Sequence, residues 1–239
     1  MPSTSPERLI WHHPEPPGRK HALTRAEIVR AGIALADTEG VSGLTMRAVA
    51  GALGVSTPMS LYRYVLNKDG LVDLMLDEVS DEVDVPAEPG DDWRDDLRGV
   101  ASSLWRMIGR HRWYAELVDS RPPFGPTTMR RAAFMLAVLD NAGLTPAVTY
   151  VSLLDNYVTG TAMSVSREIA MLERFGIGTT QDLQAYAGEM ANDSLDSWLQ
   201  DMPPLTADAR FELGLDCLLD GIAARRPVGR RSRSRPSRG

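Results

Sequence analysis

Apolar residues recur every three to four positions along most of the 239-residue chain, which is the spacing of one face of an α-helix. No segment shows the strict alternation of apolar and polar residues that is typical of a strand. The pattern therefore predicts an all-α fold, with four helices between Thr24 and Val79. After a break at the segment VDVPAEPGDD, it predicts further helices at about 92–109, 112–120, 127–142, 146–174, 180–200 and 206–224.

Residues that favour helix ends support the first four helices. Thr24, followed three residues later by Glu27, has the spacing of a capping box. Thr45 and Asn67 are expected to cap the second and fourth helices, and Gly54 is expected to end the second. These local signals and the apolar periodicity agree, which strengthens the prediction of helices here.

The two ends of the chain differ from the part between them. Residues 1–22 are rich in Pro, His and charge, and residues 226–239 are rich in Arg, and neither segment shows apolar periodicity. We expect a disordered basic arm and a disordered tail. The helical part divides into an N-terminal three-helix unit, residues 23–68, and a larger helical unit, residues 69–225.

The net charge of −6 is distributed unevenly. Residues 1–68 carry +3 and residues 225–239 carry +7, whereas residues 69–224 carry −16. Basic ends on an acidic body indicate that only the ends meet a polyanion such as DNA. The alternative for the last segment is a tail that only increases solubility.

A tight turn at Gly54–Val55 joins the second and third helices. This arrangement is typical of a helix-turn-helix, whose second helix lies in the DNA major groove. We expect that helix to begin at Ser56 or Thr57 and to bury Leu61 and Val65. The side chains left to face outward are Thr57, Met59, Ser60, Tyr62, Arg63 and Tyr64.

The outward set has the chemistry of a DNA-reading surface. Arg can donate two hydrogen bonds to guanine, Ser and Thr can bond either type of base, and Met can contact the thymine methyl. Tyr hydroxyls donate to phosphates, and Lys68 lies at a helix start, where backbone N–H groups also attract phosphate. In the alternative, Tyr62 and Tyr64 pack on the fourth helix and Arg63 pairs with an acidic side chain. Further phosphate or minor-groove contacts are expected from Arg19, Lys20 and Arg25.

Over about residues 23–80 the chain resembles the tetracycline-repressor (TetR) family of bacterial transcriptional regulators, in the stretches LTRAEIVRAGIALADTEGVSGLTMRAVAGALGV and SLYRYVLNKDGLVDLMLDEV. The most specific marks are the pair Leu61–Tyr62 and Lys68, six residues after Tyr62. The resemblance implies that Tyr62, Tyr64 and Lys68 contact phosphate and that Arg47 and the start of the third helix meet bases. The predicted DNA-binding residues are Thr45, Arg47, Thr57, Pro58, Met59, Ser60, Tyr62, Arg63, Tyr64 and Lys68.

One feature departs from the family pattern. Between Val55 and Leu61 the family commonly has four residues, whereas this chain has the five residues STPMS. The extra residue either lengthens the turn or shifts the start of the third helix. Which of residues 57–60 reach bases therefore stays open.

The larger unit is similar to the actinobacterial subgroup with a tetracycline-repressor-like C-terminal domain, in the segments HRWYAELV, FGPTTMRRAAFMLAVLDNAGL, YVTGTAMSVSRE and FELGLDCLLDGIAA. The resemblance implies a homodimer that binds a small-molecule effector. Two long amphipathic helices, one with the small residues 160–162, suit a four-helix interface between two copies. Burial of the same faces within one chain fits the periodicity as well.

A set of apolar, aromatic and polar residues in this unit has the composition of an effector pocket. An ordinary core has the same composition. The candidate pocket residues are Met107, His111, Trp113, Leu117, Phe134, Met135, Leu139, Asn156 and Tyr157.

Other function classes find little support in the sequence. The chain has one cysteine and four histidines, without zinc-like spacing, and no phosphate loop or nucleophile motif. We therefore expect no catalytic residues, metal, cofactor, signal peptide or membrane span. The leading hypothesis is a cytoplasmic homodimeric repressor that binds a palindromic operator in double-stranded DNA and releases it when an effector binds. The alternatives are a helical small-molecule-binding protein or enzyme whose N-terminal motif mediates protein contacts, and a DNA-binding activator or nucleoid factor.

Overall fold

A computed structural model of the chain describes residues 9–16, 23–121, 124–176, 182, 185 and 206–225. Regular structure in these residues is helical throughout, which confirms the all-α prediction. The tail at 226–239 and most of the helix expected at 180–200 lie outside the described residues. The elements are η2 (Ile10–His12), α1 (Arg25–Gly43), α2 (Met46–Ala52), α3 (Met59–Val65), α4 (Lys68–Ser80), α5 (Trp93–Arg110), α6 (Trp113–Ser120), α7 (Pro126–Asn141), α8 (Ala147–Phe175) and α11 (Ala207–Ala223).

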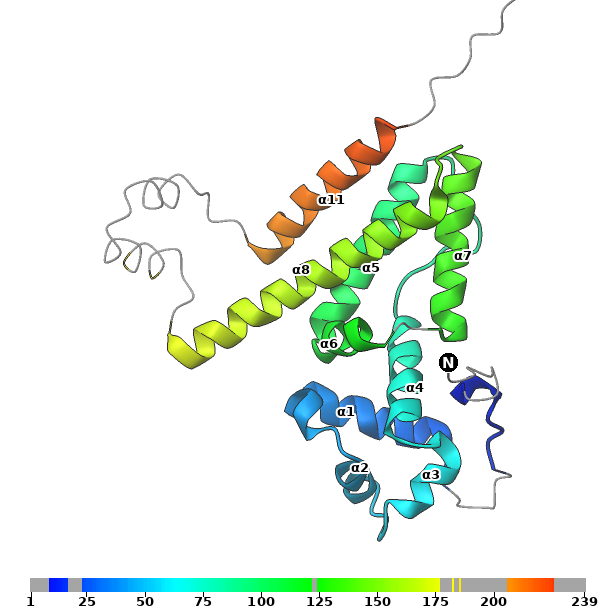
Figure 1. Ribbon diagram of the computed structural model, residues 1–239, viewed down its shortest axis with the longest axis vertical. Helices are drawn as coiled ribbons and strands as arrows, with labels where there is room; N and C mark the ends of the chain where they lie inside the picture. Colours follow the sequence, from blue (N-terminus) through cyan, green and yellow to red (C-terminus); the bar gives the residue numbers. More distant parts are fainter. Residues whose placement is uncertain are drawn as a thin grey trace, which may run out of the picture.

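The helices form two groups joined by α4 (Figure 1). Helices α1–α3 lie at one end, which we call the reading end, and α5–α8 with α11 form the body. Helix α4 packs on α1 and α3 near its start and on α5, α6 and α7 farther along. The boundary expected between residues 68 and 69 thus falls at the start of a helix that both groups share. None of the described helices is both long and apolar enough to span a membrane.

The capping residues and the glycine expected at the helix boundaries of the reading end lie where the sequence predicts them. Thr24 and Glu27 form the reciprocal capping box, and the Thr45 and Asn67 side chains accept from the backbone N–H groups of α2 and α4. Gly54 follows α2 with φ of 66°, in the left-handed region that glycine adopts without strain. Helix α3 begins at Met59, later than Ser56 or Thr57, because the chain stays in the turn through residues 56–58.

One continuous apolar core runs through both groups. In the body, α8 buries Val151, Leu154 and Val158, while α11 buries Phe211 and Leu215. The long apolar stripes of α8 and α11 are therefore used largely within one chain. Helix α11 lies along α8 and also contacts α5 (Figure 1).

Part of the N-terminal arm contradicts the expectation of disorder. Residues 9–16 include the short 3-10 helix η2, and Ile10 is only 1% exposed because it packs against α4. The segment is too short to show periodicity, and its few apolar residues give no recognisable pattern. Residues 1–8 and 17–22 of the arm lie outside the described residues.

Candidate nucleic-acid interface

Helices α2 and α3 are held in a helix-turn-helix by a buried inner face. Leu61 and Val65 of α3 are fully buried, as are Val49 and Ala50 of α2. The Val55 N–H donates to the Ala50 carbonyl at 2.9 Å, which closes the turn that follows α2. The inner face predicted for α3 is confirmed at both of its aliphatic positions.

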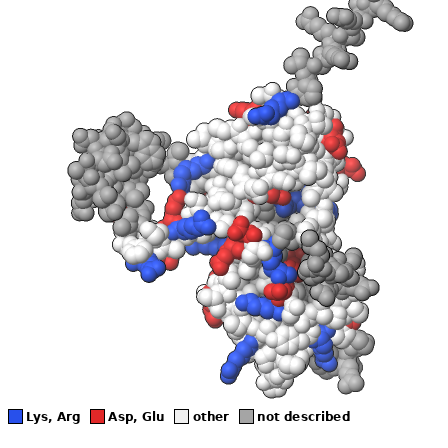
Figure 2. Space-filling view, viewed as in Figure 1, with Lys and Arg blue, Asp and Glu red and all other residues white. Residues whose placement is uncertain are grey.

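The opposite face of α3 is open to solvent. Met59 is 71% exposed, although burying its thioether side chain would be favourable, and Arg63 and Lys68 are also exposed. Tyr62 is half-buried against the core, so its ring is anchored while part of it remains accessible. Lys and Arg side chains project from this end of the molecule (Figure 2). The exposed thioether, guanidinium and ammonium are the groups that contact thymine methyls, guanine and phosphate.

Tyr64 is wrongly predicted to face outward. It is only 3% exposed, and its hydroxyl accepts a hydrogen bond of 3.0 Å from the Arg63 guanidinium, which also lies over its ring. Leu61, Tyr64 and Val65 follow the i, i+3, i+4 spacing of one helix face, and this spacing could have revealed the burial of Tyr64. Tyr64 therefore supports Arg63 from below the surface.

The hydroxyl residues in this region serve partly as local hydrogen-bond partners. Thr45 Oγ1 accepts from the Ala48 N–H at 3.1 Å and fixes the start of α2, where Arg47 is exposed. Ser60 Oγ donates to the Thr57 carbonyl at 2.9 Å, and Thr57 Oγ1 accepts from the Met59 N–H. Thr57 is exposed and Pro58 is the N-cap residue, so both precede α3. The structure thus places the departure from the family spacing in the turn and at the first residues of α3.

The Arg25 side chain, predicted to contact phosphate, is bonded to carbonyls of the protein itself. Its Nε donates to the Tyr64 carbonyl at 3.0 Å and one terminal nitrogen donates to the His13 carbonyl at 2.7 Å. The side chain is half-buried and its donors are directed into the protein. Arg19 and Lys20, expected to act with it, lie outside the described residues.

The nine candidate pocket residues do not form one group. Asn156 is exposed on α8, and the Tyr157 hydroxyl donates to the Phe211 carbonyl at 2.7 Å. His111 is buried among polar partners, described next. The others are buried in the apolar core, on α5, α6 and α7, and they are Met107, Trp113, Leu117, Phe134, Met135 and Leu139.

A polar junction connects the reading end to the body. The His111 ring contacts Asp37 of α1 at 2.8 Å and Glu82 at 3.0 Å, and the Trp113 indole N–H donates to the same Asp37 oxygen at 2.6 Å. Burial raises the pKa of the Glu82 carboxyl, but hydrogen bonds from Arg110 and His111 outweigh burial and hold that pKa below its ordinary value. Sequence reasoning missed the junction because its members lie up to 76 positions apart in the chain.

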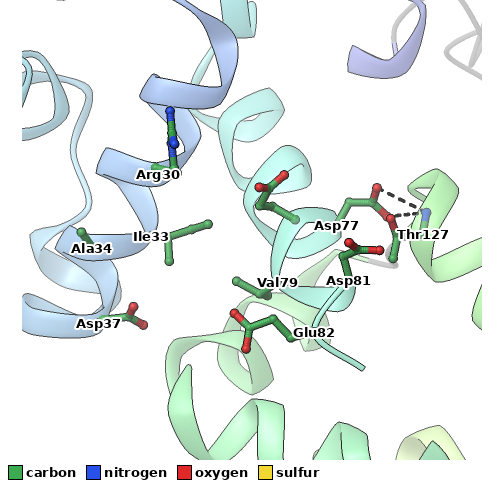
Figure 3. A pocket seen from close by; sticks show the side chains of 10 residues that line it. Arg30, Ile33, Ala34, Asp37, Asp77, Val79, Asp81, Glu82 and Thr127 are labelled. Atoms are coloured by element: carbon green, nitrogen blue, oxygen red, sulfur yellow. Dashed lines mark hydrogen bonds between the residues drawn. The ribbon is translucent and has the colours of Figure 1, made fainter. Parts of the chain in front are cut away.

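A cleft of about 590 Å³ lies beside this junction, between α1 and α4 (Figure 3). Ile33 and Ala34 of α1 and Val79 of α4 provide its apolar part. Its other lining residues are Arg30, Asp37, Asp77, Glu78, Asp81, Glu82 and Thr127. Helix α1 packs on both α4 and α6, so the cleft lies at the surface where the reading end meets the body.

The body also contains an ion pair whose arginine is buried and whose carboxylate is half-buried. Arg131 of α7 is 4% exposed and donates to Asp155 of α8 at 2.5 Å, while its Nε has no partner among the described residues. Asp77 of α4 accepts from the backbone N–H groups of Thr127 and Thr128 at the start of α7. These contacts tie α4, α7 and α8 together next to the apolar set of the body.

Known proteins match the chain over most of its length. A family model described as the tetracyclin repressor-like C-terminal domain matches residues 85–226. The transcriptional repressor DrrR1 of Streptomyces coeruleorubidus is 34% identical over 90% of this chain and 83% of that protein. The tetracycline repressor protein class A from transposon 1721 of Escherichia coli is 30% identical over 85% of this chain and 92% of that protein.

Solved structures give the same result. The crystal structure of ActR from Streptomyces coelicolor in complex with actinorhodin has a TM-score of 0.73 and 31% sequence identity, over 85% of this chain and 98% of that one. A second ActR structure, in complex with (S)-DNPA, has the same score and identity. The helix-turn-helix, the helical body and these similarities lead to one conclusion: the chain belongs to the tetracycline-repressor family of transcriptional regulators.

Proposed function

We propose that this protein is a repressor that binds a palindromic operator as a homodimer and releases it when a small molecule binds the body. The observation that carries the proposal is the exposed face of α3, which bears Met59 and Arg63, together with the exposed Lys68 at the start of the next helix, α4. An apolar side chain exposed to this extent on a helix that also exposes a cation is suited to the major groove of DNA. We propose a regulatory and not a catalytic role, in the cytoplasm, where DNA is accessible.

The dimer is proposed to form through α8 and α11. Both helices keep large apolar side chains exposed after the core is filled, including Leu153 on α8 and Leu213 on α11. Among the described residues, no other segment lies within 4 Å of where a Cβ of Gly160 on α8 would be, so a second helix could approach closely there. Two copies would then present two α3 helices to half-sites about 34–36 Å apart or a multiple of that distance.

The proposed effector is a small apolar or amphipathic molecule that binds among the core residues of α5, α6 and α7. ActR, a relative with the same fold, has been crystallised with actinorhodin and with (S)-DNPA. We propose that binding shifts α6 and the turn before it, and that His111 and Trp113 pass the shift to Asp37 of α1. A coupling free energy of about 1–3 kcal/mol is typical of such a switch.

Selection from a random duplex library tests the proposal, since the library samples every candidate operator sequence at once. We expect the wild-type protein to enrich sequences with two-fold symmetry, and we expect Arg63→Ala to lose most of the enrichment. Sedimentation of the protein on the selected duplex should show two copies per site. Enrichment of no sequence, or a complex with one copy on an asymmetric site, would contradict the proposed operator and dimer.

A further inference from the structure

The last four backbone carbonyls of α3 accept hydrogen bonds from three parts of the chain. The last four carbonyls of any helix have no partner within the helix. In α3 two of them are bonded locally: the Leu66 N–H donates to the Tyr62 carbonyl at 2.9 Å, and the Asn67 N–H to the Val65 carbonyl at 2.7 Å. The other two, of Arg63 and Tyr64, receive hydrogen bonds of 3.0 Å from the His13 Nε2 and the Arg25 Nε.

His13 belongs to a segment that is itself anchored. Residues 9–16, which we call the strap, pack against the start of α4, and Ile10 lies beside Gly70. Arg25 holds the strap from the other side, because its guanidinium donates to the His13 carbonyl at 2.7 Å. The Arg25 backbone N–H donates to Glu15 of the strap at 2.7 Å. One arginine thus connects the strap, α1 and the end of α3.

The turn between α3 and α4 needs such support. Leu66 has φ of 61°, the one positive value among the described residues other than glycine. A backbone in this region is strained and persists only where surrounding contacts fix it. Gly70 lies so close to the Val65 carbonyl that a Cβ there would collide with it. The position of α3 relative to α4 is therefore set within a narrow range, and the strap covers the same site.

We propose that residues 9–16 hold α3 in the orientation that reads DNA, with His13 and Arg25 as positioning residues. The inference rests on the proposed DNA-binding function and extends it to a segment outside the helix-turn-helix. Arg25 acts here through the carbonyls of Tyr64 and His13 and makes no contact with phosphate. His13 donates to the Arg63 carbonyl, so the strap fixes the backbone position from which the Arg63 side chain projects.

The test compares Arg25→Ala with Arg30→Ala, which removes the same charge from an exposed position on the same helix. Binding to the selected operator and to an unrelated duplex is measured over a series of salt concentrations. Loss of two hydrogen bonds from a charged group should weaken operator binding by about tenfold to a hundredfold. Binding of the unrelated duplex and the salt slope should match those of Arg30→Ala, because Arg25 contributes no phosphate contact.

A second pair of variants separates positioning from folding. His13→Ala removes the donor to the Arg63 carbonyl, whereas His13→Gln keeps an N–H at a similar distance from the backbone. We expect His13→Ala to bind the operator more weakly and His13→Gln to recover most of the affinity, with equal melting temperatures. Exchange of the amide protons of residues 66–71 should be faster in His13→Ala alone.

Three results would overturn the inference. Unchanged operator affinity in Arg25→Ala and His13→Ala would show that α3 needs no strap. A salt slope in Arg25→Ala lower than that of Arg30→Ala by about 0.9 would make Arg25 a phosphate contact. An equal loss of affinity for the operator and the unrelated duplex would also make Arg25 a phosphate contact. Failure of the wild-type protein to bind any duplex would instead contradict the proposed function.

Discussion

The reading end and the body are held together in different ways. At the reading end, α2 and α3 have seven residues each, and side chains bonded to backbone groups fix the start of α2 and the end of α3. In the body the helices reach 29 residues, and ion pairs connect their sides: Arg98 on α5 pairs with Glu212 and Asp216 on α11, and Arg131 on α7 pairs with Asp155. Short helices depend on their caps, because they contain too few internal hydrogen bonds to be stable alone.

The difference fits the separate tasks of the two groups. A DNA-reading helix must keep its orientation while one face stays bare, so its support comes from its ends and its inner face. In the proposed mechanism the body must stay intact while a shift passes through it, and ion pairs between its helices would allow them to move as a unit. The junction of Asp37, His111 and Trp113 is where the two kinds of construction meet.

The largest effect is expected from Asp155→Ala in the body. It leaves the buried Arg131 guanidinium without its carboxylate, and an uncompensated buried charge costs about 3–5 kcal/mol of unfolding free energy. Urea denaturation followed by circular dichroism measures this loss. The double variant Arg131→Met with Asp155→Leu, which removes both charges, should recover most of it. A loss below about 1 kcal/mol in the single variant would show that the pair contributes little to the body.

Arg63→Ala at the reading end should mainly weaken DNA binding and change folding stability little, the opposite of what is expected for Asp155→Ala. Loss of an arginine contact to a base costs about 1–3 kcal/mol of binding free energy, whereas loss of the hydrogen bond to the Tyr64 hydroxyl lowers folding stability by only about 0.5–1.5 kcal/mol. Fluorescence anisotropy with the selected duplex measures binding. Arg106→Ala on the exposed side of α5 is the matched control and should bind normally. Loss on all duplexes alike would assign Arg63 to phosphate, and loss on selected sequences would assign it to bases.

Trp113→Phe is expected to weaken the junction without emptying the core. It keeps an aromatic ring but removes the N–H that donates to Asp37, and the cost is about 1–2 kcal/mol because the acceptor is charged. Trp105→Phe removes a similar bond to Asp208 at an exposed site, and it should cost less. Hydrogen exchange should quicken in α1 for Trp113→Phe alone. Equal exchange in the two variants would mean that the junction does not connect α1 to the body.

The smallest effect concerns pH. The folded-state pKa of Glu82 lies below its ordinary value of 4.5, since hydrogen bonds from Arg110 and His111 outweigh the effect of burial. At this carboxyl the folded protein therefore binds fewer protons than the unfolded chain. The stabilisation of the fold by ionised Glu82 is complete above pH 4.5 and is lost as the pH falls through the folded-state pKa. Glu82→Gln should lose less stability than the wild type between about pH 5 and pH 3, by under about 1 kcal/mol. Glu88→Gln, in the loop after α4, should behave like the wild type.

Sequence patterns predicted what is local in this molecule. The capping residues Thr24, Thr45 and Asn67, the break at Gly54 and the inner face of α3 each depend on neighbours within a few positions. The exposed side chains of Met59, Arg63 and Lys68 follow from the same periodicity. Burial of Tyr64 follows from it too, but the resemblance to the family favours a phosphate contact for its hydroxyl.

Contacts between distant segments could not be predicted in this way. The bond from His13 to the Arg63 carbonyl spans 50 positions, and the bond from Trp113 to Asp37 spans 76. Nothing in the sequence around His111 distinguishes a histidine between two carboxylates from one in an effector pocket. The direction of the Arg25 side chain is equally hidden, because a basic residue at the start of the first helix can contact phosphate or donate to the last carbonyls of another helix.

Photo-crosslinking from α3 is the most direct test of the central claim, that its exposed face lies in the major groove of an operator. A photoreactive amino acid at Met59 is compared with the same group at Val148, a body residue with nearly equal exposure, 68% against 71%. We predict crosslinks from position 59 to bases in each half-site of the selected duplex and none from position 148. Crosslinks from position 148 but not from position 59, in a protein that binds the duplex, would contradict the account.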